Sequence, residues 1–129
     1  MRFLVDTHTF LWAILSPEKL SDRVTEIFTD REAELLLSIA TPWEMAVKAG
    51  IGKLENGADI LDDFEHRVTA SGYGMLETSV KHAIRSGSLP RYHKDPFDRL
   101  LVAQALDLDL PILSRDTIFD AYGVRRIWD

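Results

Sequence analysis

The chain has 129 residues, enough for one domain with a buried core and too few for two. Its 46% hydrophobic content excludes a disordered chain, and its net charge of −6 counts against simple binding to duplex backbones. Cysteine is absent, which excludes disulfides and thiolate metal sites and fits a reducing cytosol. We expect one domain over residues 1–129, cytoplasmic and without a membrane span.

The N-terminal third predicts a strand, two helices and a second strand. Residues 2–5 are β-prone and end at Asp6. A helical apolar pattern follows as far as Ser16-Pro17, and Ser21 is the expected cap of a second helix. Residues 35–39 are apolar except for Ser38, which favours a strand buried on both faces.

The middle of the chain predicts three more helices and another strand. Thr41-Pro42-Trp43-Glu44 has the pattern of a capping box with proline in the first turn, and Gly50 lies at the end of the helix that it starts. Ala58 to Ser71 is expected to form one further helix. Tyr73 to Glu77 predicts a strand, and Thr78 is the expected cap of the next helix.

The clearest helix start lies within residues 93–106. Asp95 is the expected N-cap and Pro96 fits the first helical position. Asp98 then shares a helix face with the apolar Leu101 and Val102, so its carboxylate points along the side that packs on the core. Taken alone, Asp95 and Asp98 could also serve only as a cap and as partners of the helix dipole.

Two more strands are expected near the C-terminus, at residues 111–113 and 124–128, with a short helical turn through Phe119 between them. Strands therefore alternate with helices along the whole chain. This order predicts an α/β sandwich of three layers, with a mainly parallel central sheet of about five strands and helices on both faces.

Four acidic residues fall where the carboxyl ends of such strands meet. Asp6 ends the first strand, Glu44 follows the second, Asp98 lies in the first turn of its helix, and Asp116 follows residues 111–113. Ligands bind at this edge of a parallel sheet. We expect the four carboxylates to share one site.

Crowded carboxylates take up protons or hold a cation, and oxygen ligands suit Mg²⁺ or Mn²⁺. We expect Asp6 and Asp98 to contact the ion directly, with Glu44 and Asp116 closing the site, partly through water. Such a centre favours displacement at phosphate. The residues alone leave nuclease and phosphatase chemistry both open.

The sequence also resembles a known family. Five segments are similar to those of PIN-domain ribonucleases. They are Leu4-Val-Asp-Thr-His8, Thr41-Pro-Trp-Glu-Met-Ala-Val-Lys48, Gly52-Lys-Leu54, His93-Lys-Asp-Pro-Phe-Asp-Arg-Leu-Leu-Val-Ala-Gln-Ala105 and Ser114-Arg-Asp116. The likeness is closest to the VapC-like toxins of bacterial toxin–antitoxin pairs, and it covers nearly the whole chain.

That resemblance implies a PIN-like fold and a Mg²⁺- or Mn²⁺-dependent endoribonuclease, in which metal-activated water attacks an RNA phosphodiester. It implies a homodimer that is neutralised by a small antitoxin. It maps the catalytic acids onto Asp6, Glu44, Asp98 and Asp116, of which Asp6, Asp98 and Asp116 are metal ligands. Asp98 takes the family position and Asp95 stays the helix cap.

Several residues around these acids have supporting roles with open alternatives. The resemblance gives Thr7 and Ser114 as hydroxyl residues that steady the site. Lys48 forms an ion pair with Glu44 one helical turn away or contacts phosphate. Arg99 orients Asp98 or binds RNA.

Two other function classes remain as alternatives. One is a metal-dependent phosphatase or phospho-receiver-like domain, although a receiver needs paired acids after its first strand, where Asp6 stands alone. The other is a non-catalytic module whose acidic cleft binds a basic peptide.

Overall fold

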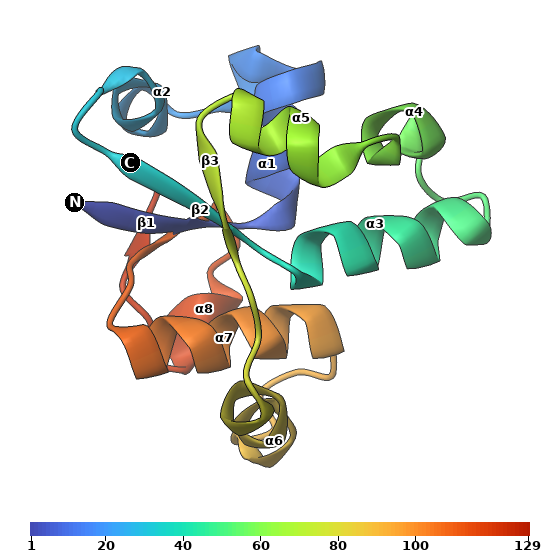
Figure 1. The fold of residues 1–129 in the computed structure, drawn as a ribbon. Coiled ribbons are helices and arrows are strands. Elements are labelled where there is room, and N and C mark those ends of the chain that lie inside the picture. Colours follow the sequence, from blue (N-terminus) through green and yellow to red (C-terminus); the bar gives the residue numbers. More distant parts are fainter.

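The centre of the molecule is a sheet of five parallel strands, and the computed structural model describes all of residues 1–129 (Figure 1). The strand order is β3-β2-β1-β4-β5. The strands are β1 Arg2–Val5, β2 Glu34–Ser38, β3 Tyr73–Leu76, β4 Ile112–Leu113 and β5 Arg126–Ile127. Every neighbouring pair is parallel, so the predicted mainly parallel sheet of about five strands is confirmed.

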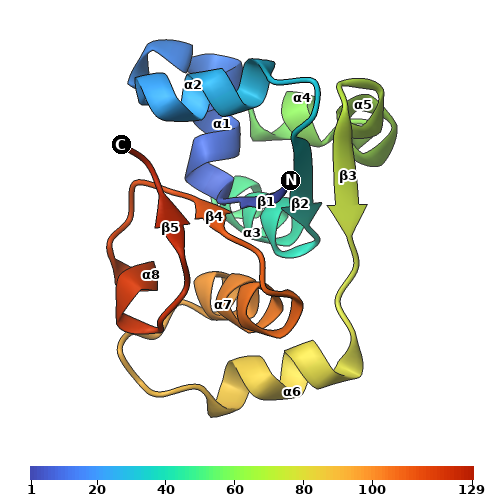
Figure 2. The same cartoon turned by 90° about the vertical axis from the view of Figure 1, so that its left-hand side faces the viewer.

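Helices cover both faces of this sheet, as predicted (Figures 1 and 2). In both views α1, α2, α4 and α5 lie on one side, α6, α7 and α8 lie on the other, and α3 extends from the end of β2. Their bounds are α1 Thr7–Leu15, α2 Asp22–Thr29, α3 Ala40–Gly50, α4 Gly57–Leu61, α5 Phe64–Ala70, α6 Val80–Ser88, α7 Pro96–Leu108 and α8 Ile118–Ala121. None of these helices has the length and apolar character needed to span a membrane.

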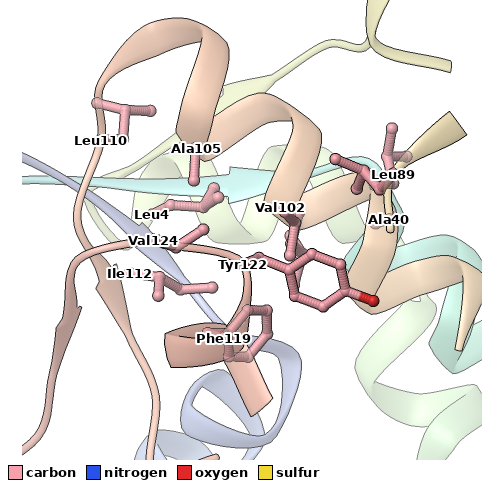
Figure 3. Close-up of a cluster of buried hydrophobic side chains, with 12 residues drawn as sticks. Leu4, Ala40, Leu89, Val102, Ala105, Leu110, Ile112, Phe119, Tyr122 and Val124 are labelled. Atoms are coloured by element: carbon pink, nitrogen blue, oxygen red, sulfur yellow. The ribbon is translucent and has the colours of Figure 1, made fainter. Parts of the chain in front are cut away.

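Alternating side chains of β1 divide the interior into two cores. Phe3 and Val5 belong to a cluster with Phe10 on the side of α1, α4 and α5. Leu4, between them, belongs to a second cluster with Val102 of α7, which Figure 3 shows. β1 is the central strand and is buried on both faces. The residue that follows it therefore lies in the middle of the sheet edge.

The start of α7 is built as the sequence predicts. One oxygen of the Asp95 carboxylate accepts the backbone N–H groups of Phe97 and Asp98, at 2.9 and 3.0 Å. Pro96 is the first helical residue, where it lacks only an N–H that would have no helical partner. Since the Asp95 carboxylate caps the helix, capping does not account for the presence of the Asp98 carboxylate.

The predicted capping box at the start of α3 is wrong. The helix begins two residues earlier than that box implies, at Ala40, and the hydroxyl of Ser38 accepts the Ala40 N–H at 3.0 Å. The hydroxyl of Thr41 instead lies 2.9 Å from that of Thr7, in the first turn of α1. Thr41 therefore joins two helices at the sheet edge, a contact between distant segments that a local pattern does not reveal.

Two further local predictions need correction. The single helix expected over Ala58 to Ser71 is divided into α4 and α5 by Asp63, whose φ of 49° is left-handed and stops a continuous helix. The cap of α6 is Ser79, not Thr78, and it forms a reciprocal capping box with His82.

Arg99 is the largest departure from expectation. It is only 4% exposed and directs its guanidinium at the loop between α6 and α7, away from solvent. Its acceptors, at 2.8 to 3.4 Å, are the carbonyls of Ser86, Leu89, Pro90 and His93 and the hydroxyl of Tyr122. Arg99 makes no direct contact with Asp98, and its guanidinium is held by acceptors inside the fold rather than left free for RNA.

We predict that Arg99→Met lowers the free energy of unfolding by about 3 kcal/mol or more, since it leaves several buried carbonyls without a donor. Urea unfolding followed by circular dichroism measures the change. The matched control is Arg91→Met in the same loop, where the side chain is exposed and the expected change is within about 0.5 kcal/mol. Equal stability of the two variants would contradict the structural role of Arg99.

Candidate active site

Asp6 occupies the centre of the carboxyl edge of the sheet. It directly follows β1, stands at the N-cap position of α1 and is 3% exposed. Its side chain makes no cap hydrogen bond; instead, the Ser114 hydroxyl donates to Asp6 Oδ2 at 2.8 Å. Ser114 therefore has the steadying role predicted for it. No cationic side chain pairs with Asp6, although its carboxylate is buried.

Ser114 also connects Asp6 to Asp116. The Ser114 oxygen accepts the backbone N–H of Asp116 at 3.0 Å while its own proton goes to Asp6. The Asp116 carboxylate accepts the N–H of Ile118 at 3.0 Å and is otherwise exposed to solvent. The loop after β4 thus places a second carboxylate beside the first.

Glu44 comes from α3 and is 2% exposed. Lys48, one turn later, donates to Glu44 Oε2 at 2.5 Å, so the ion-pair alternative for Lys48 is confirmed. The Lys48 side chain keeps 37% of its surface exposed. Glu44 is therefore a buried carboxylate with a cation at its outer side.

Asp98 is held by a chain of three side chains that the sequence did not indicate. Arg99 donates to the Tyr122 hydroxyl at 3.1 Å, and in the neutral imidazole that donates from Nε2, His93 Nδ1 accepts the Tyr122 proton at 2.8 Å. His93 then carries its proton on Nε2, which donates to Asp98 Oδ2 at 3.2 Å. This chain fixes both the tautomer of His93 and the orientation of Asp98.

The ring of Tyr122 packs in the core on the α7 side, as Figure 3 shows, with its hydroxyl at the edge of that core. No pattern in the sequence links Tyr122 with His93, which lies 29 residues earlier. His93 itself stands two residues before the helix cap Asp95, and that position was its only signal.

Burial, with a smaller contribution from neighbouring acids, raises the pKa values of Asp6 and Asp98. Burial raises the pKa of Asp6 from 3.8 to about 7; Glu44 and Asp116 add to the rise, and the Ser114 hydrogen bond opposes it. Burial also raises the pKa of Asp98 to about 7, with Asp95 and Asp6 as the next causes and the His93 hydrogen bond opposing them. Asp98 therefore feels the charge of Asp6 across the sheet edge.

In the conformation of the structure, no three histidine, aspartate or glutamate side chains are close enough together to hold one ion. Lys48 and His93 bind Glu44 and Asp98 instead. The donor chemistry nevertheless fits a hard divalent cation, because Asp6 is a buried carboxylate with no cationic partner and its charged neighbours are carboxylates. The ligand set of Asp6, Asp98 and Asp116 stays a prediction.

A pocket of about 380 Å³ opens beside Asp6 and Asp116. Its other walls come from α1 and from the loop after β4, and they are His8, Thr9, Trp12, Arg115 and Thr117. Glu44 and Asp98 do not line this pocket, so they lie on another side of Asp6.

The fold and these acids define a small α/β protein with an acidic site at the carboxyl edge of a parallel sheet. The sequence model of the PIN domain matches residues 3–124. The chain therefore belongs to the PIN domain family, whose members are in general nucleases that use divalent metal ions. No curated protein matches the sequence.

Solved structures with the same fold come from bacterial toxin–antitoxin complexes. The chain matches DNA-bound VapBC from Salmonella typhimurium with a TM-score of 0.72 and 19% identity, over 98% of this chain and 97% of that one. It matches VapBC2 from Rickettsia felis, bound to a promoter DNA fragment, with a TM-score of 0.70 and 14% identity over 100% of both chains. For FitAcB from Neisseria gonorrhoeae the TM-score is 0.68 and the identity 19%, over 98% and 96%.

We predict that Asp6→Asn stabilises the metal-free protein at pH 8. The folded pKa of Asp6, about 7, is higher than 3.8, so its contribution to stability is present at low pH and is lost as the pH rises through 7. The substitution removes this loss and raises the free energy of unfolding by up to about 4 kcal/mol at pH 8, with little change at pH 4.

Urea unfolding in EDTA at both pH values measures this effect. The same substitution at the exposed Asp62 is the control, with an expected change within about 0.5 kcal/mol at either pH. An Asp6→Asn variant that is less stable than the parent at pH 8 would show that the Asp6 carboxylate is not under electrostatic stress.

Proposed function

We propose that this protein is a Mg²⁺- or Mn²⁺-dependent endoribonuclease and the toxin of a toxin–antitoxin pair. The observation that carries the proposal is Asp6, a buried carboxylate that has no cationic partner and feels the charges of Glu44 and Asp116. Membership of the PIN domain family supports nuclease chemistry over the phosphatase, receiver and peptide-binding alternatives.

In this proposal Asp6, Asp98 and Asp116 are the metal ligands. Ser114 keeps Asp6 in place, and His93 does the same for Asp98. Glu44 completes the site, and its pairing with Lys48 holds its carboxylate in one orientation. When bound, the divalent ion supplies Lewis acidity at the scissile phosphate and lowers the pKa of water.

The proposed partners are RNA, an antitoxin protein and a second copy of the chain, in the cytoplasm. The matched VapBC and FitAcB structures, and a toxin–antitoxin complex from Klebsiella pneumoniae with a TM-score of 0.60, support the antitoxin. Trp43 and Val47 of α3 and its C-cap Ile51 recur every fourth residue and are 49%, 44% and 62% exposed. An apolar stripe of this kind supports a protein interface, and we assign it to the homodimer.

We predict that Asp98→Asn reduces cleavage of single-stranded RNA in Mn²⁺ at least 100-fold, because it removes the charge of a metal ligand. EDTA is expected to abolish cleavage by the parent protein. Asp95→Asn is the matched control: asparagine still caps α7, so this variant is expected to keep its activity. Product length on denaturing gels gives the readout, and an active Asp98→Asn protein would refute the assignment of Asp98.

We also predict that Tyr122→Phe weakens Mn²⁺ binding about tenfold, because it removes the hydroxyl that sets the proton position on His93 and thereby the orientation of Asp98. Titration calorimetry measures the affinity. Tyr92 is exposed, and its ring packs edge-on against Tyr122 with ring centroids 5.0 Å apart. Tyr92→Phe is therefore the control, because it removes a neighbouring tyrosine hydroxyl that does not contact His93. Unchanged affinity in a folded Tyr122→Phe protein would contradict this role.

A further inference from the structure

The pocket beside Asp6 is lined by several residues that have no part in the acidic site. On one side of it lie His8 and Trp12, one helical turn apart on α1, with ring centroids 6.4 Å apart. Arg115, between Ser114 and Asp116 in the loop after β4, also lines it. We propose that this pocket is a subsite for the nucleotide next to the scissile phosphate, an inference that rests on the proposed function.

The aromatic wall is held in place before any ligand binds. The rings of Trp12 and Trp128 pack in an edge arrangement with centroids 5.8 Å apart. The Lys19 ammonium lies 5.8 Å from the centre of the Trp12 ring. Trp128 belongs to the C-terminal segment, which is itself tied to α2 because Ser21 donates a hydrogen bond to the Trp128 carbonyl. A fixed indole loses little freedom when a base stacks on it, which favours binding.

The polar groups of the pocket suit a nucleotide. Arg115 is exposed and makes no ion pair or side-chain hydrogen bond within the chain, so its guanidinium is available to a phosphate oxygen or a base edge. The hydroxyl of Thr9, also in the wall, is buried and has no hydrogen-bond partner. A buried unpaired hydroxyl is costly, and a polar group of a ligand would relieve that cost.

Position and size favour one nucleotide of a single strand over a peptide. The pocket shares Asp6 and Asp116 with the candidate metal centre, so an occupant lies directly beside the reacting phosphate. Its volume of about 380 Å³ is at the small end of ligand sites, where one base with its sugar fits. Aromatic side chains with one basic group are the usual means of holding single-stranded nucleic acid.

The test compares cleavage of four RNA oligonucleotides that differ only in the nucleotide next to the cut, by the full protein in Mn²⁺. We expect Arg115→Met and His8→Ala to lower kcat/KM about tenfold and to reduce the preference among the four substrates. Trp12→Leu is expected to lower it by tenfold or more, the loss typical of one stacked base.

The controls make the same chemical changes away from the pocket. Arg31→Met alters an exposed arginine before β2, at the opposite edge of the sheet, and His66→Ala alters an exposed histidine on α5. Both are expected to cut as the parent does. Thermal unfolding establishes that each variant is folded, and the exposed positions Arg115 and His8 keep the test decisive if Trp12→Leu does not fold.

The outcomes separate this inference from the function on which it rests. A parent protein that cuts none of the RNAs in Mn²⁺ contradicts the nuclease itself. The subsite alone is overturned if the parent cuts in an EDTA-sensitive manner and the Arg115→Met and His8→Ala proteins cut at the same rate with the same preference among the substrates. Loss of binding to a protein partner, with cleavage unchanged in these variants, also overturns it and assigns the pocket to a peptide.

Discussion

The structure depends on one electrostatic constraint, the burial of the Asp6 carboxylate in the middle of the sheet edge. Glu44 and Asp98 each have a basic side chain within hydrogen-bond distance, but the Asp6 carboxylate has only neutral donors, the Ser114 hydroxyl and the Thr7 backbone N–H. A buried charge without a cation is unfavourable, and the surrounding carboxylates make it more so. A fold selected for stability alone has no reason to place an aspartate at this position.

The parallel topology explains why the acids meet at all. β1 lies between β2 and β4, so the residues that follow these three strands come together although they are far apart in the sequence. Asp6 follows β1, Glu44 follows β2 in α3, and Asp116 follows β4. Asp98 arrives by a different route, from the first turn of α7, and it is the only one of the four that depends on a helix cap for its position. The accuracy of the site therefore depends on Asp95 as well as on the sheet.

Much of this arrangement was predictable because it depends on periodicity and on strand ends. The parallel sheet follows from the alternation of strands and helices, and the cap at Asp95 is a local pattern, whereas the order of the strands was not predicted. The incorrect predictions concern residues whose contacts or conformation depend on segments distant in the sequence. The threonine pattern at Thr41 predicts a cap, but Thr7 offers it another partner. Asp63 adopts a left-handed conformation without the glycine that usually marks one. His82 of α6 is buried where it contacts Asp107 of α7, and no local pattern reveals this contact.

Arg99 and Asp98 illustrate most clearly what a sequence does not reveal. They are neighbours in the first turn of α7, and their adjacency suggests that the guanidinium binds the carboxylate. The structure separates them, because Arg99 turns into the loop between α6 and α7 whereas Asp98 contacts His93. The two remain connected indirectly: Arg99 binds both the His93 carbonyl and the Tyr122 hydroxyl, which in turn hold the imidazole. A residue that stabilises the loop thereby also sets the orientation of a candidate metal ligand, so stability and site geometry at this edge depend on the same buried cation.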